Sequence, residues 1–481
     1  MKIVIIGAGF TGSLLAKALV AEGNNVILID DDSERVRTAG DQLDCTVIEA
    51  DGKNLISLEK AGIADADALI TLTGDDEINL IVCSLVDAVY PDIVKIARVR
   101  DYDHYIRTME VTRRSRERVG RELQRPTFGI NYLLNPDVEA AGTIMRAMEI
   151  GAAGTFTEIG GDYGIVTLMV GDASRLSNKK LKDLATLEGW NFLVAFVESD
   201  GETIMPGGET VIKAGDHVGI LTSKQDVPKV LEFTGAVSAP MDRVAIFGAD
   251  NISALTVAAQ MEEKQTFWYS LLSLGRSKRR KLIVIDRDGS RCRQLSEKFP
   301  QARILNGDIT DDGLLQDEDI CNCDLMVAAS GNYERNLMTA AYLKLRGVRR
   351  VIALTSDSAF DEIADKLGVD VTIPMRDIVI DAIISRLRGH NVSAVHSIGA
   401  RKFEIVSCEI SPKSKVAGKH LRDIGRNDGE LVLLVKNPGS DKHDIPNGDT
   451  VLESGAHAVV IMPSGNADII RKFAGKLEMS A

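Results

Sequence analysis

The sequence predicts an α/β protein with two doubly wound, parallel-sheet Rossmann-type domains, each followed by a small α+β module. Two observations lead to this prediction. Each half opens with a short apolar run that enters a glycine, Lys2–Gly7 and Arg243–Gly248, which is the pattern of a buried parallel strand. Later in each half, the turn segments Met205–Val211 and Ile445–Val451 separate short alternating runs, as expected for strands joined by tight turns.

The two halves are related by tandem duplication. Asp51 precedes Thr73 by 22 residues, and Asp308 precedes Ser330 by the same 22 residues. The paired segments are Val26–Asp30 with Leu282–Asp286, Glu49–Asp51 with Asn306–Asp308, and Leu72–Asn79 with Ala329–Asn336. We therefore expect the order domain, module, domain, module.

Strand and helix patterns alternate along the first domain. Ser13–Glu22 carries the apolar face of a helix at Leu14, Leu15, Ala18 and Leu19. Further strands are expected at Thr46–Ile48, Ala68–Thr71 and Val94–Ala97. Such alternation favours a parallel sheet with crossover helices.

A further helix is expected between the first domain and its module. Asn135 and Pro136 are typical of a helix start. One face is then apolar, through Val138, Ala141, Ile144, Met145 and Met148, and the counterpart in the second half runs from Pro374 to Leu387. The pattern leaves two packings open: a crossover or dimerisation helix, or a helix that covers its own sheet.

These patterns give the expected domain boundaries. The first Rossmann-type domain covers residues 1–134, with its crossover helix to about 150, and the first module covers residues 151–236. The second, degenerate Rossmann-type domain covers residues 241–373, with its helix to about 390, and the second module covers residues 391–476.

Composition excludes several classes of protein. The net charge of −13 argues against nucleic-acid binding. No apolar run approaches the roughly 20 residues of a membrane-spanning helix, and the N-terminus does not resemble a signal peptide. We therefore expect a cytoplasmic chain. The six cysteines include no CxxC pair and no histidine has metal-ligand spacing, which favours free buried thiols over a metal site.

The turn Gly7-Ala-Gly9-Phe10-Thr11-Gly12 follows a strand and opens a helix. This is the context that the dinucleotide-binding fingerprint requires, because the glycines allow the tight turn, the approach of a pyrophosphate and close helix–strand packing. Asp30 ends the second strand, 18 residues after Gly12. A carboxylate there can accept the ribose hydroxyls and repels a 2′-phosphate, which favours NAD over NADP.

Other residues gain a role from their place at the ends of strands. Asp51 is expected beside the adenine, and Thr73, Gly74 and Asp75 follow the fourth strand. Ligands of open α/β sheets bind at these carboxyl ends. Arg98 ends the fifth strand and can donate to a phosphate; the alternative for Arg98 is a surface ion pair.

The corresponding turn of the second half is degenerate. Asp250 and Ser253 replace the second and third glycines of the fingerprint. Aligning the two halves by sequence places Thr355 at the position of Arg98, whereas Asp286 and Asp308 are retained. We expect this domain to bind an ordinary dinucleotide poorly, although a nucleoside without close phosphate contacts remains an alternative.

Together, the glycine turn, Asp30, Asp51, Thr73–Asn79 and Ile96–Arg100 resemble the RCK or KTN domain, and the two modules resemble its C-terminal partner. Two such pairs in one chain are the layout of the peripheral regulatory subunits of Trk potassium-uptake systems. The resemblance implies a regulator that is not an enzyme. It further implies a homo-oligomer, a dimer or tetramer ring, docked on a membrane potassium-translocating subunit at the inner face of the cell membrane, that binds NAD(H), with ATP and ADP as further ligands. Carried over by position, the pocket comprises Gly7, Gly9, Phe10, Thr11, Gly12, Asp30, Asp51, Thr73, Gly74 and Arg98.

The sequence departs from this family pattern in two basic runs. Gly275–Lys281 belongs to an insertion of about 15 residues, and Arg107–Arg125 looks longer than the usual linker. Either run can be a solvated loop or helix face, which is the favoured interpretation, or can face anionic lipid or an acidic partner.

The alternative function is an NAD-dependent oxidoreductase. Such an enzyme needs an acid or base near the nicotinamide, and the first module offers few candidates. His217 lies in a turn-like segment, and His457 occupies the matching place in the second module, which favours a shared structural role for the two histidines.

Overall fold

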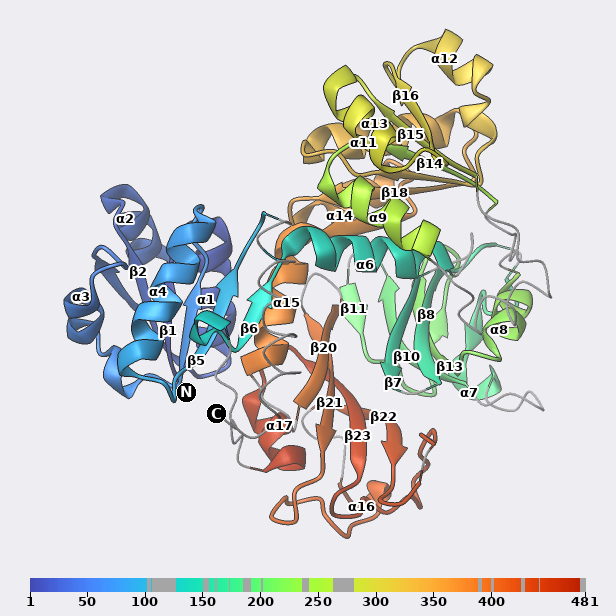
Figure 1. Ribbon diagram of the computed structural model, residues 1–481. Helices are drawn as coiled ribbons and strands as arrows, with labels where there is room; N and C mark the ends of the chain where they lie inside the picture. The colour runs from blue at the N-terminus through green and yellow to red at the C-terminus, as the bar shows by residue number, and fades with distance from the viewer. Residues whose placement is uncertain are drawn as a thin grey trace. The chain divides into compact units, whose positions relative to one another are not determined.

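The structure is a computed structural model of the 481-residue chain (Figure 1). It describes residues 1–101, 105, 127–149, 155–160, 162–172, 174–184, 192–199, 202–235, 242–262, 281–387, 392–398, 402–424, 429–440 and 442–475. The chain divides into two compact units. The first comprises Met1–Pro136, Ile378–Val395 and Ser464–Ala481, and the second comprises Asp137–Asp377 and His396–Pro463.

The first unit contains a six-stranded parallel sheet, the first sheet, in the order β3-β2-β1-β4-β5-β6. Its strands are β1 (Lys2–Ile6), β2 (Asn25–Asp30), β3 (Thr46–Glu49), β4 (Ala68–Thr71), β5 (Val94–Arg98) and β6 (Tyr132–Leu134). This is the strand order of a Rossmann fold, in which the chain reverses direction between β1 and β4. The carboxyl ends of β1 and β4 therefore flank the place where such folds bind ligands.

Helices connect these strands and bury both faces of the sheet. They are α1 (Phe10–Ala21), α2 (Ser33–Gln42), α3 (Leu55–Lys60) and α4 (Asp76–Val89), with short 3-10 turns at Ile63–Asp65 and Thr127–Gly129. Side-chain oxygens of Asp32, Asn54 and Asp75 cap the N-termini of α2, α3 and α4, as short polar residues commonly do. We call this sheet with its helices the first Rossmann-type domain.

The second unit repeats this design. Its parallel sheet, the second sheet, has the order β16-β15-β14-β17-β18-β19. The strands are β14 (Arg243–Phe247), β15 (Lys281–Asp286), β16 (Arg303–Asn306), β17 (Leu325–Ala328), β18 (Arg350–Thr355) and β19 (Val371–Pro374). The helices are α9 (Asn251–Glu262), α11 (Gly289–Lys298), α12 (Asp312–Asp317), α13 (Tyr333–Leu345) and α14 (Asp361–Lys366). The predicted pair of doubly wound parallel sheets is thus confirmed.

Strand register corrects one equivalence between the halves. Ala97 pairs with the last residue of β4, and Ala353 pairs with the last residue of β17. The following residues, Arg98 and Leu354, are therefore equivalent, and the assignment of Thr355 to this position was wrong. That assignment was one residue out because it followed the ends of two strands that differ in length.

The two long helices that follow the sheets pack away from the sheet that precedes each of them. α15 (Met375–Leu387) buries Val379, Ile380, Ile383, Ile384 and Leu387 in the hydrophobic core of the first sheet. The Arg386 guanidinium also lies over the ring of Tyr132 in β6. α6 (Pro136–Glu149) belongs to the second unit, where the Met145 sulfur accepts a hydrogen bond from Gln260 of α9 at 3.4 Å. Each Rossmann-type domain is thus completed by a helix from the other half of the chain.

Two small antiparallel modules complete the second unit. The first sheet of this kind joins β7 (Thr155–Gly160), β8 (Tyr163–Met169), β10 (Leu193–Ser199), β11 (Glu202–Ile204) and β13 (His217–Ser223). The other joins β20 (Val392–Ile398), β21 (Phe403–Glu409), β22 (Leu431–Lys436) and β23 (His457–Pro463). The smaller elements are β9 (Lys179–Lys180), β12 (Val211–Ile212), α7 (Leu181–Leu184), α8 (Val227–Thr234) and α16 (Leu421–Ile424); α17 (Ala467–Ala474) lies in the first unit.

The two modules share a hydrophobic core, in which Phe196 and Leu221 of the first module pack with Leu434 and Val459 of the second. His217 and His457 each begin the central strand of their module, in agreement with a shared structural role. Among the described residues, no helix combines the length and the apolar character needed to cross a membrane.

Candidate functional site

The glycine turn between β1 and α1 depends on two close approaches of the backbone. Gly7 has a φ of +109°, and its N–H donates to the carbonyl of Ile29 at 2.8 Å. A Cβ atom on Gly12 would lie 1.9 Å from the carbonyl oxygen of Gly7. Only glycine therefore fits at both positions without moving the start of α1 away from β1.

Gly9 has a different role, because it leaves space empty. It is the N-cap residue of α1, no side chain caps this helix, and a Cβ atom on Gly9 would have no neighbour within 4 Å. Phe10 and Thr11 form the first turn, and the Phe10 side chain is 60% exposed. The backbone N–H groups at this helix start thus face open space, an arrangement that attracts anions.

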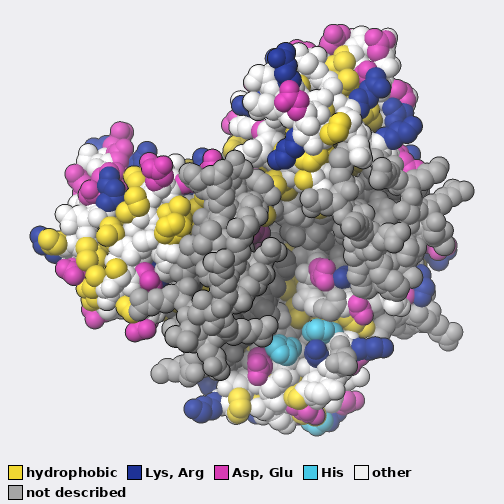
Figure 2. Space-filling view, viewed as in Figure 1, with side chains coloured by type: hydrophobic (Ala, Val, Ile, Leu, Met, Phe, Trp, Pro, Cys, Tyr) yellow, Lys and Arg dark blue, Asp and Glu magenta, His cyan; other side chains and the backbone are white. Residues whose placement is uncertain are grey.

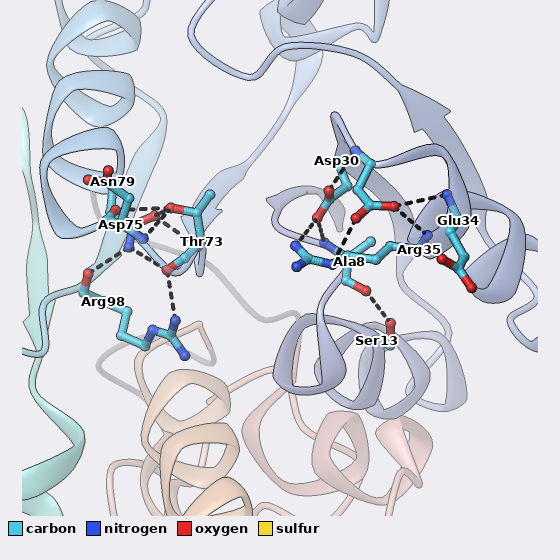
Figure 3. A network of polar contacts seen from close by, with 10 residues as sticks. Ala8, Ser13, Asp30, Glu34, Arg35, Thr73, Asp75, Asn79 and Arg98 are labelled. Atoms are coloured by element: carbon cyan, nitrogen blue, oxygen red, sulfur yellow. Dashed lines mark hydrogen bonds and ion pairs between the residues drawn. The ribbon is translucent and has the colours of Figure 1, made fainter.

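Asp30 ties the glycine turn to the end of β2. Its side chain is nearly fully buried, its Oδ2 accepts the N–H of Ala8 at 2.6 Å, and its Oδ1 accepts the N–H of Asp32 at 3.0 Å. The Arg35 guanidinium lies 3.8 Å from Oδ2 (Figure 3). A carboxylate oxygen has two lone pairs, so Asp30 retains acceptor capacity for a ligand hydroxyl while it holds the loop.

The loop after β4 is organised by Asn79, a residue that the sequence analysis quoted only as part of the repeat. The Asn79 Oδ1 accepts the N–H and the hydroxyl of Thr73 at 2.9 and 2.8 Å. Its Nδ2 donates to the carbonyls of Thr73 and Arg98 at 3.2 and 2.9 Å (Figure 3). The recurrence of asparagine at Asn336, six residues after Ser330 as Asn79 is after Thr73, was the available signal.

Arg98 reaches from the end of β5 to this same loop. Its Nη2 donates to the carbonyl of Thr73 at 2.7 Å, whereas its Nε is buried without a hydrogen-bond partner. Burial, and secondarily the neighbouring Arg100, lowers the pKa of the guanidinium, which still stays charged at neutral pH. A buried cationic donor without an acceptor is suited to a ligand anion.

The remaining predicted residues lie at the edges of these networks. Gly74 follows Thr73 in the loop and has open space around its Cα, as Gly9 has. Asp51 is exposed; its Oδ1 accepts the N–H of Lys53 at 2.9 Å and lies 3.8 Å from the Lys53 ammonium. It contacts neither the Asp30 nor the Asn79 network, although Gly52 beside it packs on Ile6 at the end of β1.

These features together fit an adenosine phosphate. The uncapped start of α1 and the Arg98 guanidinium supply donors for phosphate, and Asp30 supplies an acceptor for a sugar hydroxyl. Both lie at the carboxyl ends of the parallel strands, where such folds bind ligands. The arrangement is suited to binding, since it offers phosphate donors and a hydroxyl acceptor.

Comparison with known proteins decides the family. Residues 3–114 and 269–374 match the TrkA-N domain, and residues 165–235 and 405–475 match the TrkA-C domain. The chain belongs to the TrkA family. It is 27% identical over 467 residues to the Trk system potassium uptake protein TrkA of Halomonas elongata, with 96% of each chain covered. It is also 27% identical over 482 residues to the Trk system potassium uptake protein TrkA homolog 1 of Methanosarcina mazei, with 98% and 100% covered.

Solved structures agree with this fold. The GsuK RCK domain aligns with a TM-score of 0.57 at 15% identity, over 98% of this chain and 94% of that chain. The GsuK channel bound to NAD aligns with a TM-score of 0.56 at 16% identity, over 98% of this chain and 78% of that chain. The tandem of TrkA-N and TrkA-C domains thus accounts for both halves of the chain.

The two basic runs fall almost entirely outside the part of the chain that the structure describes. Arg107–Arg125 lies outside it, and of Gly275–Lys281 only Lys281, the first residue of β15, is described. Both interpretations of these runs therefore stay predictions.

Proposed function

We propose that this chain is a cytoplasmic, nucleotide-sensing regulatory subunit of a potassium-uptake system, peripheral on the inner face of the cell membrane. One observation carries the proposal: the uncapped start of α1 lies in the same site as a buried, partly unpaired arginine, within a tandem TrkA-N/TrkA-C chain. The two TrkA relatives compared above, which are named as Trk potassium uptake proteins, support the potassium-uptake role over nearly their full length.

The proposed ligand is NAD(H), with ATP and ADP as further candidates. Phosphate oxygens would accept from the N–H groups at Gly9, Phe10 and Thr11, and from the Arg98 guanidinium. Asp30 would accept the ribose hydroxyls, and Asp51 would lie beside the adenine. Gly7 and Gly12 shape the turn, whereas Thr73 and Gly74 form the opposite wall. The structure of a GsuK channel bound to NAD, which shares the fold, supports this assignment.

Gating follows from a difference in affinity between two shapes of the assembly. A ligand shifts such an equilibrium only as far as it binds one shape better than the other. Arg98 is suited to report this difference, because its guanidinium already joins the ends of β4 and β5 through Thr73. A phosphate that recruits the guanidinium therefore alters a contact between two strands, and ligands with different phosphate numbers alter it to different extents.

Calorimetry on the intact protein tests the ligand. We expect NAD+, NADH, ATP or ADP to bind, and Gly9→Asp to abolish binding because a carboxylate would occupy the open space over the helix start. Gly40→Asp on α2 is the matched control, since it adds the same charge where a Cβ also meets no neighbour. If no adenine nucleotide binds, the proposal is wrong; turnover of NADH with a small substrate would instead favour an oxidoreductase.

We further propose that the chain forms a homo-oligomer, a dimer or tetramer ring, beneath a Trk-type membrane subunit. Ile81, Leu85 and Val89 follow one another along α4 at four-residue spacing, with exposed fractions of 51%, 36% and 48%. Figure 2 shows hydrophobic side chains gathered on the surface of the first Rossmann-type domain. An exposed apolar stripe of this kind supports an interface. Light scattering should therefore give a smaller particle for Leu85→Glu, and potassium flux through the reconstituted membrane subunit should lose its nucleotide dependence.

A further inference from the structure

The glycine turn of the second Rossmann-type domain keeps the backbone of the first. Gly248 has a φ of +108°, and its N–H donates to the carbonyl of Ile285 at 2.9 Å. The N–H of Ala249 donates to the Oδ2 of Asp286 at 2.8 Å, as that of Ala8 does to Asp30. The turn itself is therefore intact, and any loss of function must come from side chains.

Asp250 takes the place of Gly9 at the start of the helix. The N–H of Ala254 donates to the carbonyl of Asp250 at 2.9 Å, and the N–H of Ser13 donates to that of Gly9 at the same distance. The Asp250 carboxylate accepts the backbone N–H of Ser253, which is a donor at the start of α9. The second domain thus carries a carboxylate of its own where the first leaves an uncapped helix start and open space.

The surroundings of Asp250 further disfavour a phosphate. Its Oδ1 is buried without a hydrogen-bond partner. Burial raises the pKa of Asp250 to about 6, and Asp137 and Asp286 raise it further against the opposing effects of the Ser253 N–H and Arg291. A phosphate placed here would meet three carboxylates, and like charges in a partly buried site repel strongly.

Two more substitutions remove what a phosphate would need. Leu354 lies at the position of Arg98, so the cationic donor at the end of the fifth strand is missing. Ser253 lies at the position of Gly12, where a Cβ in the first domain would collide with the turn, and its Oγ is buried without a partner. The TrkA-N match in the second half also begins at residue 269, after this turn.

We propose that Asp250 is a built-in anion cap that excludes nucleotide phosphates from the second Rossmann-type domain, so that each chain binds one nucleotide, in the first domain. The count of one rests on the proposed function, whereas the exclusion by Asp250 does not. In physical terms, Asp250 gives α9 the negative charge that a bound phosphate would give α1. The second domain is therefore held in one charge state while the first responds to its ligand.

Equilibrium dialysis with labelled ATP and NADH, run on the full chain, tests this proposal by stoichiometry. We expect one nucleotide per wild-type chain, none for Gly9→Asp, and two for the double variant Asp250→Gly/Ser253→Gly. Adding Leu354→Arg to the double variant should tighten the second site at least about tenfold, because it restores a charge-assisted donor. Circular dichroism and the retained first site show that each second-domain variant is folded.

Three results would overturn the proposal: two nucleotides per wild-type chain, a Gly9→Asp chain that is folded and still binds with wild-type affinity, or a folded double variant that gains no site. The Gly9→Asp arm keeps the test decisive if the double variant fails to fold, since the space over Gly9 is open. If the wild-type chain binds nothing, the proposed function fails. The double variant still decides the role of Asp250, because a gained site supports it and an unchanged one refutes it.

Discussion

The guanidinium of Arg98 is joined to Thr73 by a hydrogen bond of 2.7 Å between its Nη2 and the main-chain carbonyl. The bond links the ends of two adjacent parallel strands, β4 and β5. It leaves the Nε of the same guanidinium buried and unpaired. Because an unpaired buried donor costs free energy, a ligand phosphate that approaches this side gains more than it would from an exposed arginine.

Arg98→Ala should therefore weaken ATP and NAD(H) binding about 10- to 100-fold, the loss expected for a charged hydrogen bond of about 1.5–3 kcal/mol. Adenosine, which lacks phosphate, should lose less than about twofold. Calorimetry with adenosine, ADP and ATP measures this difference. Arg37→Ala on α2 removes an equal charge from an exposed position and should leave all three affinities unchanged. Equal losses for adenosine and ATP would refute the role of Arg98.

Asn79→Ala should loosen the loop after β4 and weaken nucleotide binding. Asn79 is fully buried and makes four hydrogen bonds with Thr73 and Arg98, so its loss leaves several buried groups unpaired, at about 2–4 kcal/mol. Asn336→Ala is the matched control. It breaks the equivalent bonds with Ser330 and Leu354 and should destabilise the second domain without changing nucleotide affinity. Hydrogen exchange, read by peptide, separates the two effects.

The fold could be predicted because its signals are local. Apolar runs that end in glycine, the tight turn and the spaced aspartates each identify an element without knowledge of its neighbours, and the internal repeat doubled every one of these signals. The turn at Gly7, Gly9 and Gly12 was predictable for the same reason, since each glycine answers a steric demand within a few residues.

What the sequence did not reveal depends on contacts between distant segments. Asn79 is important because its amide meets the carbonyl of Arg98, 19 residues away, and no local pattern gives that distance. The equivalence of Arg98 with Leu354 needed strand register. The partner of α15 could not be read from its apolar face, because Ile380 and Ile383 would be equally apolar on either sheet.

The glycines of the turn should differ sharply in their tolerance of alanine. Gly9→Ala should keep the wild-type Tm, because φ is −63° and the space is open, but should weaken nucleotide binding at least about tenfold by crowding the phosphate. Gly12→Ala places a Cβ 1.9 Å from the Gly7 carbonyl oxygen and should destabilise the first domain by about 3 kcal/mol or more. Thermal unfolding with and without nucleotide distinguishes the two. A Gly12→Ala chain with wild-type Tm would contradict the close approach.

The exchange of α15 predicts that a mutation in the second half destabilises the first domain. Ile383 is fully buried in the core of the first sheet, and Ile383→Ala should cost about 2–5 kcal/mol. Hydrogen exchange should rise in β1 and β4 rather than in β14 and β17. Leu345→Ala, at a side chain that is 85% exposed, should change neither region. If β14 and β17 lose protection instead, α15 packs on the sheet of its own half.

The stability of the second domain should depend on pH through Asp250. Burial raises the pKa of Asp250 to about 6 in the folded chain, from a model value of 3.8. A carboxyl with a raised folded pKa stabilises the fold while it is protonated, and this contribution is lost as pH rises through about 4 to 6. Asp250→Asn cannot ionise, so its stability relative to wild type should grow across this window by up to about 3 kcal/mol and then level off above about pH 7. Hydrogen exchange in β14 and α9 at pH 4.5 and 7.5 measures the difference, with the first domain as internal reference. An Asp250→Asn chain that tracks wild type at both pH values would mean that the carboxylate is solvated, which would also remove the basis for an anion cap at this helix start.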